Sequence, residues 1–579
     1  MDYANLFRTT KNKSQSSNNE EFLLYKAGFL EPIGDGLNFF LPLGWKVLRK
    51  IAAIIRQELD SIDGQEIRMP FVMPYSYLEK SARAEIFAKE LGIFQNNQGE
   101  TYVLPPAREE AISEFVKNSN YNNWSSPLVL YEIQSQYRDI NTTTNHLLES
   151  KESLRGEVWS FHLSDTSLNN FIPKIFSTFT TIFNRCGIEF NKGLGSTEFS
   201  GATNAFEFFV DSTHGNQQIL CCPNCGYCAN KTIAQAIPRL RSDNPLEAKK
   251  IFLKDISSPQ DVRQQLKVGL DEIANAVVYK AMGNFYMAVI RADYEISEIK
   301  LARYLKVPSV TQATAKELEK LDLVFESLSP MNLPAKAANN ITILIDETIA
   351  NSSNLIYGTN ESDYYYQNGN FGVDYESEFI TDMAMVHSHD LCKQCGTPLA
   401  KKQAIEFAKI YKIGSFFSNQ LHVTTLNKKG KETLLQIGSY YIDLNRLLLA
   451  IAEKNNDEQG LVWPFAIAPY LYYLINEGDS LSLIRATKEI YSSIKDITIF
   501  DQTSVSLEEK KKQAALLGIP YQIILTDSLI KDGKITIIER KGLLSHTLLL
   551  ADFLENLNLL SSGVDPKETS LLKEEKNAN

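Results

Sequence analysis

The stretch GSYYIDLNRLLLAIAEKNNDEQGLVWP, from Gly438 to Pro464, decides the fold of the chain. Its first residues have the composition of a β-strand, and the apolar residues that follow have the spacing of an amphipathic helix. Arg446 lies where the two elements meet, and Tyr441 and Asp443 stand just before it. Because side chains alternate along a strand, Tyr441 and Asp443 share one face. The stretch predicts a strand that runs directly into a helix, with a bulky and a negatively charged side chain before the junction.

Length and composition set the class of the protein. A chain of 579 residues is long enough for roughly three or four domains, and 44% hydrophobic and 22% charged residues are ordinary for a globular protein. No apolar run approaches the roughly 18 to 20 residues that span a bilayer, and the first residues lack the apolar core of a signal peptide. We therefore expect a cytoplasmic protein without membrane contact. The net charge of -11 argues against nonspecific binding of DNA, although a local basic face can still hold RNA.

The cysteines fall mainly in two clusters, CCPNCGYC and CKQC. A CxxC knuckle puts two thiolates on one turn, and two knuckles together supply the four soft ligands of a tetrahedral zinc site. The best quartet is Cys222, Cys225, Cys392 and Cys395. The alternative is a set of free thiols from which the metal has been lost. The gap between the knuckles is longer than in an ordinary zinc ribbon, which suggests a domain inserted between two adjacent strands.

The pattern along the chain supports such an insertion. From Trp45 the apolar spacing is helical, and a turn and a short strand ending at Pro70 follow. Between about residues 240 and 385 the pattern changes to a self-contained α/β unit. After Pro464 strands and helices alternate again to about residue 560, and the remaining residues have the composition of a disordered tail.

A set of motifs occurs in a defined order: LPLGWKVLRKI to MPFVMP, PLVLYEIQSQYRD, an inserted unit with VVYKA, RADYEISEIKL and NLIYGTNESDYYY, the opening stretch extended to APY, and LLGIPYQIIL. In this order and spacing the sequence resembles the bacterial-type prolyl-tRNA synthetases, which are class II aminoacyl-tRNA synthetases. The resemblance runs from about residue 5 to about residue 560. The inserted unit resembles the editing domain that hydrolyses mischarged alanyl-tRNA, the last motif resembles the anticodon-binding domain, and the others resemble the three class II motifs.

The resemblance implies a fold class and a domain order. The fold is an α+β catalytic domain with the antiparallel sheet and helices of class II synthetases, an inserted α/β editing-like domain, and a C-terminal α/β anticodon-binding-like domain. The predicted boundaries are 1–237 and 386–464 for the two parts of the catalytic domain, 238–385 for the editing-like domain, 465–562 for the anticodon-binding-like domain and 563–579 for a disordered tail.

The resemblance also implies a chemistry. In this family the amino-acid carboxylate attacks the α-phosphate of ATP, and the terminal ribose hydroxyl of tRNA then attacks the adenylate. Both steps develop negative charge, so arginines and Mg²⁺ are implied at the site. The resemblance assigns Arg138 to the α-phosphate and carboxylate, Arg446 to the γ-phosphate and Glu109 to the ammonium group of the substrate. Glu157 is expected at the ATP site, where it can partly replace an acidic family residue on the metal side.

Several site positions depart from the family pattern. Tyr441 and Asp443 replace glycines that let the nucleotide lie flat against the strand, so a phenol fills that space and a carboxylate repels the triphosphate. We predict that these two residues weaken ATP binding. Other positions have lost a basic residue or alter the proline pocket: Thr142, Thr144, Glu149, Ala107, Arg108, Ala408, Lys409 and Phe206.

The editing-like unit combines a matching residue with two departures. Lys280 matches the family lysine that can hold the terminal phosphate or adenosine of tRNA. Tyr365 stands where the family has a histidine, and Glu326 where it has a glycine at the pocket wall. These two changes argue against editing activity.

Three functions fit the sequence. The first is ATP-dependent attachment of proline to tRNA through a prolyl-adenylate. The second is a paralogue that does not charge tRNA and binds tRNA or a partner synthetase in a regulatory role. The third is an adenylating enzyme for another acid or acceptor, because Ala107, Lys409 and Phe206 rebuild the amino-acid pocket. We expect tRNA as a partner, and a homodimer through Leu41 to Pro70, since the amphipathic helix and strand there have no other obvious apolar partner.

Overall fold

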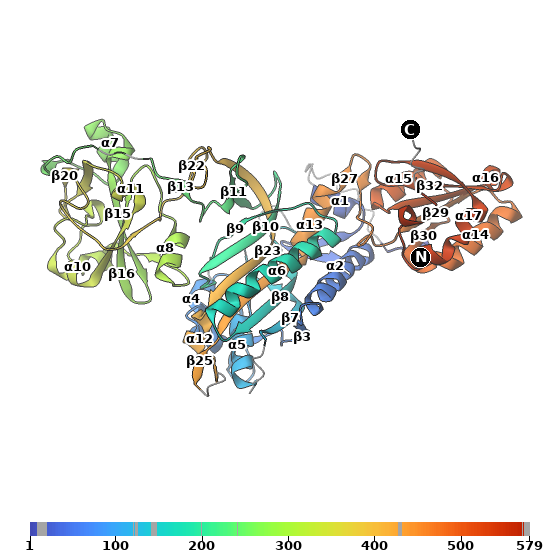
Figure 1. Ribbon diagram of the computed structural model, residues 1–579, viewed down its shortest axis with the longest axis horizontal. Helices are drawn as coiled ribbons and strands as arrows, with labels where there is room; N and C mark the ends of the chain where they lie inside the picture. Colours follow the sequence, from blue (N-terminus) through green and yellow to red (C-terminus); the bar gives the residue numbers. More distant parts are fainter. Residues whose placement is uncertain are drawn as a thin grey trace.

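The structure, a computed structural model, describes residues 1–7, 20–119, 121, 126–140, 147–198, 200–239, 241, 243–426, 431–569 and 571–572. Three bodies follow one another along the long axis of the molecule (Figure 1). We call them the inserted domain, at one end, the central domain, and the C-terminal domain, at the other end. Among the described residues, no helix has the length and apolar character needed to cross a membrane.

Within the described residues, nine strands form the sheet of the central domain, in the order β10-β9-β12-β11-β23-β26-β8-β7-β3. Neighbours are antiparallel except for β12 with β9 and β3 with β7, and β10 also pairs with β23. We call this the central sheet. Its strands are β3 (Gln65–Glu66), β7 (Leu128–Tyr137), β8 (Glu152–His162), β9 (Asn191–Leu194), β10 (Asn204–Asp211), β11 (Gln217–Cys221), β12 (Cys228–Asn230), β23 (Ala400–Gly414) and β26 (Gln436–Asp443).

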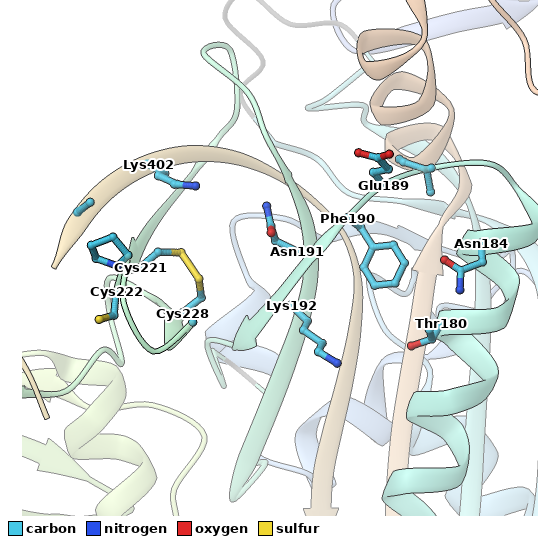
Figure 2. Close-up of a pocket in the computed structure, with 14 residues that line it drawn as sticks. Thr180, Asn184, Glu189, Phe190, Asn191, Lys192, Cys221, Cys222, Cys228 and Lys402 are labelled. Carbon is cyan, nitrogen blue, oxygen red and sulfur yellow. A yellow bond between two sulfur atoms is a disulfide. The ribbon is translucent and has the colours of Figure 1, made fainter. Parts of the chain in front are cut away.

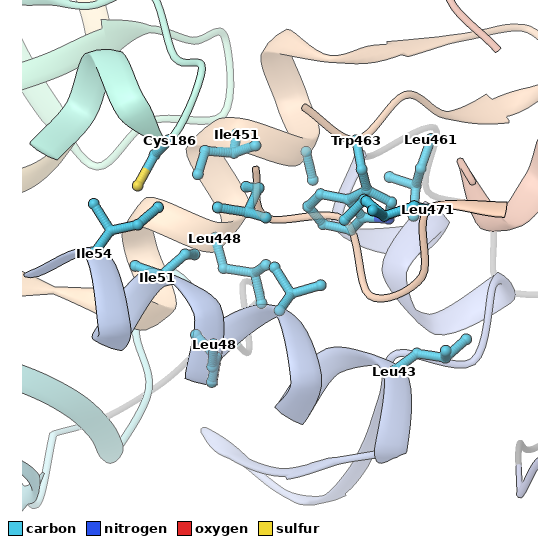
Figure 3. Close-up of a cluster of buried hydrophobic side chains, with 14 of the residues drawn as sticks. Leu43, Leu48, Ile51, Ile54, Cys186, Leu448, Ile451, Leu461, Trp463 and Leu471 are labelled. Carbon is cyan, nitrogen blue, oxygen red and sulfur yellow. The ribbon is translucent and has the colours of Figure 1, made fainter. Parts of the chain in front are cut away.

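Long helices cover one face of the central sheet (Figure 1): α2 (Pro42–Asp60), α6 (Asp165–Arg185) and α13 (Leu444–Lys454). Their apolar stripes bury one another in a shared core, in which Leu48 and Ile51 of α2 lie near Leu448 of α13 (Figure 3). The strand and helix predicted for the opening stretch are confirmed, because β26 ends at Asp443 and α13 begins at the next residue.

Helix α2 corrects one argument of the sequence analysis. Its apolar side chains, including Val47, Leu48, Ile51 and Ile55, are buried in the core of their own chain against α6 and α13. The reason given for a homodimer, that this helix has no other apolar partner, is therefore wrong. The spacing of the apolar residues predicts a buried stripe, but it does not reveal which chain covers that stripe.

The rest of the central domain frames the sheet with short elements. They are α1 (Glu20–Lys26), β1 (Leu30–Gly34), β2 (Leu37–Phe40), β4 (Met73–Pro74), α3 (Tyr75–Lys80), α4 (Ala84–Phe87), β5 (Gly92–Gln95), β6 (Thr101–Leu104), α5 (Glu109–Asn118), β13 (Ala236–Ile237), β22 (Leu391–Cys392), α12 (Phe416–Leu421), β24 (Thr424–Leu426), β25 (Glu432–Leu434), β27 (Asn456–Asp457) and β28 (Gly460–Leu461). The pair β13 and β22 joins the two chain segments that lead into and out of the inserted domain.

The inserted domain has its own sheets and its own cores. In the described residues one sheet has the order β17-β15-β16-β18-β21 and another the order β14-β20-β19. The elements are β14 (Lys249–Phe252), α7 (Pro259–Leu266), β15 (Ala274–Ala281), β16 (Asn284–Arg291), α8 (Glu298–Leu305), β17 (Thr311–Gln312), α9 (Ala315–Glu319), α10 (Ala335–Asn340), β18 (Ile341–Asp346), α11 (Glu347–Ala350), β19 (Leu355–Gly358), β20 (Tyr364–Gly369) and β21 (Ile380–Thr381). The predicted change of pattern between about residues 240 and 385 corresponds to this domain.

The C-terminal domain shares a core with the central domain. Its sheet has the order β30-β29-β31-β32-β33, and the buried guanidinium of Arg540 reaches Asp457 of β27 at 2.5 Å. Residues from the start of the chain also pack here: Asp2 bridges to Phe500, and the ring of Tyr3 lies 5.7 Å from that of Tyr473. The elements are β29 (Tyr472–Glu477), α14 (Leu481–Ile494), β30 (Thr498–Asp501), α15 (Leu507–Leu517), β31 (Tyr521–Thr526), α16 (Asp527–Lys531), β32 (Lys534–Glu539), β33 (Ser545–Leu549), α17 (Leu550–Glu555) and α18 (Leu557–Ser561).

The segment predicted as a disordered tail differs from that expectation where it is described. A 3₁₀ helix, η5, spans Pro566–Glu568 with Asp565 as its N-cap, and Thr569 and Leu571 behind it are buried. The polar composition suggests a tail that cannot bury enough surface, but one leucine reaches the shared core and the cap anchors the turn. Residues 570 and 573–579 lie outside the described residues.

Candidate functional site

The face of the central sheet opposite the long helices carries a concentration of charged side chains. Strand pairing aligns them in rows: Tyr441 lies opposite Glu157 on β8 and opposite Lys409 on β23, and Lys409 lies opposite Glu207 on β10. The residues between them in each strand, such as Tyr440 and Val158, belong to the helix-packed core. Alternation along the strands therefore separates one apolar face from one polar face. We call the latter the polar face.

Asp443 and Tyr441 lie on the polar face, as predicted, and both have partners within the chain. Asp443 caps α13 by accepting the backbone N–H of Arg446 at 3.1 Å, and its other oxygen receives Nε of Arg155 at 3.2 Å. The hydroxyl of Tyr441 donates to Glu406 at 3.1 Å. The Arg155 guanidinium lies 4.8 Å from the centre of the Tyr441 ring. Burial, followed by the charge of Glu406, raises the pKa of Tyr441 well above its usual range, so the phenol remains a donor.

Arg446 meets a carboxylate on the same face. Its guanidinium lies 3.0 Å from Glu406, and its Nε donates to the backbone oxygen of Leu148 at 3.1 Å. Glu406 stands three positions from Lys409, a spacing that would put it on the opposite face of a regular strand. The register between β10 and β23 shifts between Phe208 and Phe209, and this bulge turns Glu406 toward Arg446.

Lys409 and Glu207 form a buried ion pair at 3.1 Å, with side-chain exposures of 8% and 0%. Burial alone lowers the pKa of Lys409, but Glu207, together with Tyr411, Tyr441 and Glu406, more than reverses that effect, and the pKa lies well above its ordinary value. The ammonium group therefore stays charged at neutral pH. The resemblance predicts Lys409 at the proline pocket, and the structure gives its charge an acidic neighbour, Glu207.

The floor of the polar face is a second buried cluster. Arg108, 1% exposed, contacts Glu132 at 2.6 Å and lies 3.7 Å from Glu157. The amide of Gln136 donates to the other oxygen of Glu157. Burial raises the pKa of Glu157 to about 7 despite the opposing charge of Arg108, with Glu109 and Glu132 acting in the same direction as burial. Near neutral pH this carboxyl is therefore divided between its protonated and ionised forms.

Glu109 opens α5 and is held in place from two sides. It accepts a hydrogen bond from the hydroxyl of Ser439 at 3.0 Å and pairs with Arg83 at 3.0 Å. Arg83 also pairs with the neighbouring Glu110 at 2.7 Å. Because one guanidinium serves two carboxylates, the group as a whole keeps a net negative charge. Such a group can accept a ligand cation.

Arg138 lies apart from this network. It follows the last residue of β7, and its guanidinium contacts Glu90 at 2.6 Å with 29% of the side chain exposed. Glu109, Glu157 and Arg446 all lie around β26, because Ser439 bonds Glu109, Tyr441 pairs opposite Glu157 and Arg446 follows the strand, whereas Arg138 contacts Glu90 instead.

The inserted domain contains a cavity of about 210 Å³ lined by Tyr365, Glu326, Ser327, Gly358 and others. The hydroxyl of Tyr365 donates to the backbone oxygen of Glu326 at 3.0 Å. Lys280 does not line this cavity; its ammonium binds Glu317 at 2.7 Å. The hydrogen bond from Lys280 helps to lower the pKa of Glu317 to about 2. Tyr365 and Glu326, the two residues that depart from the family pattern, therefore meet at the cavity wall, and Lys280 lies outside the cavity.

The two cysteine knuckles meet where the inserted domain leaves the central domain. The sulfur atoms of Cys222, Cys225, Cys392 and Cys395 all lie within 4.8 Å of one another. Two of these separations are 3.4 and 3.7 Å. Four sulfurs around one zinc ion at about 2.3 Å stand roughly 3.8 Å apart, so the donor set fits a tetrahedral soft-metal site. Hydrogen bonds from Thr397 lower the pKa of the Cys395 thiol to about 6, which favours the thiolate that a metal requires.

Comparisons with known proteins agree over most of the chain. The proline–tRNA ligase of Fusobacterium nucleatum is 31% identical over 513 residues, which are 87% of this chain and 89% of that protein. The chain belongs to the prolyl-tRNA synthetase family. The proline–tRNA ligase of a Sulfurihydrogenibium species is 30% identical over 547 residues, which are 93% and 95% of the two chains. A family model described as an aminoacyl-tRNA editing domain matches residues 254–374.

Solved structures of prolyl-tRNA synthetases have the same fold. The Giardia lamblia protein in complex with prolyl-adenylate has a TM-score of 0.55 at 13% identity, covering 92% of this chain and 74% of that one. The Cryptosporidium parvum protein complexed with L-proline and AMP has a TM-score of 0.52 at 11% identity, covering 94% and 79%. With the editing-domain match, these findings confirm the predicted fold class, an α+β catalytic domain with an inserted editing domain.

Sequence reasoning missed two acidic partners on the polar face. Glu207 and Glu406 neutralise Lys409 and Arg446, and neither was expected at the site. For Glu207 a signal exists: the motif NAFEFFV places one carboxylate inside an apolar strand, which requires a buried partner. The motif AIEFA carries the same signal for Glu406, but the face that Glu406 takes depends on the bulge, which no local pattern reveals. The altered positions Thr142 and Thr144 lie outside the described residues.

Proposed function

We propose that the chain attaches proline to tRNA in an ATP-dependent reaction that passes through prolyl-adenylate. Family membership at 31% identity over 87% of the chain supports this function. Ser439 of β26 donates to Glu109, Tyr441 of the same strand lies opposite Glu157, and Arg446 follows the end of that strand. The observation that carries the proposal is therefore that Glu109, Glu157 and Arg446 all lie around one strand. These are the residues that the resemblance assigns to the substrate ammonium, the metal side and the γ-phosphate.

Glu109 suits the recognition of an amino group. Ser439 and Arg83 hold the carboxylate in one orientation, and Arg83 divides its charge between Glu109 and Glu110. The remaining negative charge is available to a substrate ammonium. Such a charge-assisted contact orients the amino acid with its carboxylate toward the phosphates.

The phosphate side of the site requires an exchange of partners. Arg446 and Arg155 are matched by Glu406 and Asp443, so the local charges cancel. A triphosphate can bind the guanidinium of Arg446 only by displacing Glu406. In the same way, the triphosphate must displace Glu90 to bind Arg138. Carboxylate oxygens such as those of Glu406 and Glu157 fit the hard oxygen-ligand preference of Mg²⁺, which when bound would offset phosphate charge.

A second candidate is a paralogue that binds tRNA without charging it. The specific observation in its favour is that Arg446, Arg155, Arg108 and Lys409 each contact a carboxylate of the same chain. A polar face that neutralises itself is stable without nucleotide. In this reading the synthetase fold is kept as a binding scaffold, for tRNA or for a partner synthetase.

ATP–pyrophosphate exchange separates the two functions. We expect exchange that depends on proline and is lost in Arg446→Ala, whereas Lys336→Ala, which breaks an exposed pair with Asp322 in the inserted domain, leaves it unchanged. A panel of other amino acids in the same assay tests the third function, adenylation of a different acid. Absence of exchange with every acid, together with retained binding of tRNA in a filter assay, would overturn the ligase proposal in favour of the second candidate.

The same proposal includes a metal, a partner and a compartment. We assign zinc to the four-cysteine cluster of Cys222, Cys225, Cys392 and Cys395, and we assign the chain to the cytoplasm.

We also propose a homodimer, now supported by exposed apolar side chains in and beside the segment from Leu41 to Pro70. These are Phe39, Trp45, Phe71 and Val72. A monomer in light scattering at micromolar concentration would contradict the dimer.

A further inference from the structure

Three cysteines remain outside the four-cysteine cluster, and two of them belong to the hairpin that supplies Cys222 and Cys225. Cys221 ends β11 and Cys228 begins β12; they stand directly opposite each other and are joined by a disulfide. The turn between them supplies Cys222 and Cys225. Figure 2 shows the Cys222 thiol pointing away from the disulfide, as expected for neighbours in a strand. The disulfide and the cluster therefore occupy opposite sides of one hairpin.

The disulfide is within reach of small molecules. Cys221 and Cys228 line a cavity of about 700 Å³ that is open to solvent on one side of the central sheet (Figure 2). Behind it, Cys221 packs against Phe209 and Ala404. The cavity wall also carries Lys192, Lys402 and Glu189, and Lys402 is paired with Asp211 at 2.6 Å. A thiolate, the species that attacks disulfides, thus approaches past lysine side chains.

The hairpin does not depend on the disulfide for its place in the sheet. β11 pairs with β12 and with β23, and β12 pairs with β9. The turn itself is different: the disulfide closes its base, and within it the backbone N–H of Cys222 donates to Tyr227 at 2.7 Å. Opening the disulfide should therefore leave the sheet intact and release mainly the turn that positions Cys222 and Cys225.

We propose that Cys221 and Cys228 form a reversible thiol–disulfide exchange site that controls how tightly the neighbouring cluster holds a soft divalent metal. Disulfides in a reducing compartment are rarely structural and more often redox-sensing, so this inference rests on the proposed cytoplasmic location and on the proposed zinc site. The reacting partner is a low-molecular-weight thiol and its disulfide, as in a glutathione pool.

The exchange balances in two steps. A thiolate attacks one sulfur of the pair, the Cys221–Cys228 bond breaks, and the displaced cysteine leaves as a thiolate that takes up a proton. A second thiol then attacks the mixed disulfide, which frees the remaining cysteine and yields the oxidised small-molecule disulfide. Two electrons and two protons pass to the protein. The reverse reaction with the small-molecule disulfide closes the hairpin again.

Closing the turn should strengthen metal binding because fewer conformations of Cys222 and Cys225 are lost on coordination. The effect is limited, since strand pairing already restrains both ends of the turn. We expect the oxidised protein to hold zinc roughly threefold to tenfold more tightly than the reduced protein. The double variant Cys221→Ser with Cys228→Ser should behave as the reduced protein whatever the redox buffer.

The first test follows the disulfide alone. The full-length protein is equilibrated with reduced and oxidised glutathione in different ratios, quenched in acid and labelled with two mass tags, one before and one after reduction. We expect Cys221 and Cys228 to change together across the series without denaturant, while Cys186, buried in the core, stays reduced. A pair that is reduced in every buffer, or oxidised until the chain is denatured, would overturn the exchange site.

The second test measures the metal. Zinc affinity is determined by competition with a chelator for the oxidised protein, the reduced protein, the double serine variant and the control Cys186→Ala, which lies outside the hairpin. The proposal requires the oxidised protein and the oxidised control to bind more tightly than the other two. Equal affinities would overturn the coupling while leaving the metal site in place. Absence of metal from every form would overturn both the metal site and its coupling to the disulfide. The first test would still show whether the disulfide exchanges with glutathione.

Discussion

The four-cysteine cluster and the polar face of the central sheet are both built from ligand-type side chains, but they differ in how they are satisfied. In the cluster the sulfurs lie within 4.8 Å of one another, an arrangement that a cation would hold together. On the polar face Arg446, Arg155 and Lys409 already have carboxylate partners within the chain. A site that lacks its counter-charge depends on a ligand for stability, whereas a site that contains it must break contacts to bind one. The experiments below test this contrast.

The largest effect is expected at the cluster. Purified protein should carry about one zinc per chain, and Cys392→Ser with Cys395→Ser should remove it. Structural zinc contributes roughly 10 kcal/mol or more of apparent binding free energy, so its loss should open the junction between the central and inserted domains. Metal analysis and limited proteolysis near residues 386–400 measure both consequences. Protein purified without chelators that contains no metal would contradict the assignment.

The next effect is expected at the buried pair of Lys409 and Glu207. Lys409→Met leaves a fully buried carboxylate without its partner, which should lower the free energy of unfolding by about 3 to 5 kcal/mol. The double variant Lys409→Met with Glu207→Leu should recover most of that loss, since neither charge then remains. Thermal unfolding of the wild type, of Lys409→Met, of Glu207→Leu and of the double variant completes the cycle. Equal loss in the single and double variants would show that packing, not charge, holds this part of the face.

A third test opens the nucleotide strand. Tyr441→Gly with Asp443→Gly removes the phenol over Arg155 and the carboxylate before Arg446, and we expect Mg·ATP to bind roughly two decades more tightly. The cost in stability is the N-cap of α13, about 1 kcal/mol, together with the buried pair of Asp443 and Arg155, whose loss adds roughly 3 to 5 kcal/mol. Tyr441→Phe with Asp443→Asn keeps the bulk and the cap, and should recover only the part of the gain that is due to charge. Calorimetry that finds low-micromolar binding already in the wild type, with no gain in the glycine variant, would show that the site is not blocked.

The smallest effect concerns Glu157. Its pKa is raised from 4.5 to about 7 in the folded protein, so the folded state retains a proton that the unfolded state loses as the pH rises from 4.5 to 7. The wild type should therefore become less stable as the pH rises through that range, and the loss between pH 5.5 and 8 should be about 2 kcal/mol. Glu157→Gln should remove this dependence, and its advantage in thermal unfolding should be larger at pH 8 than at pH 5.5. A stability difference between the wild type and Glu157→Gln that does not change with pH would show that another group titrates in this range.

The sequence predicts those features that depend on local pattern or on an ordered set of motifs. The strand and helix between Gly438 and Pro464, the separate inserted domain and the meeting of the two cysteine knuckles all follow from spacing. What it does not predict depends on contacts between distant strands. The bulge that turns Glu406 inward, the disulfide between Cys221 and Cys228 and the burial of α2 each require a partner that no local pattern identifies.

Charge at the site shows the same limit. Arg138, Arg446 and Glu109 were expected from matching motifs, and the structure gives each of them a partner from elsewhere in the chain. A motif indicates which ligand a side chain can bind. Whether that side chain is free to bind it depends on residues such as Glu90, which stands 48 positions away from Arg138.

The contacts of the first residues with the C-terminal domain have a consequence for biosynthesis. Asp2 and Tyr3 leave the ribosome well before their partners Phe500 and Tyr473, which follow nearly 500 residues later. At about 5 to 20 residues per second, this interval lasts roughly 25 to 100 s. During that time the apolar surface of Tyr3 and Leu6, buried in the finished protein, is exposed to chaperones, and the two ends of the chain can join only after the inserted domain has emerged.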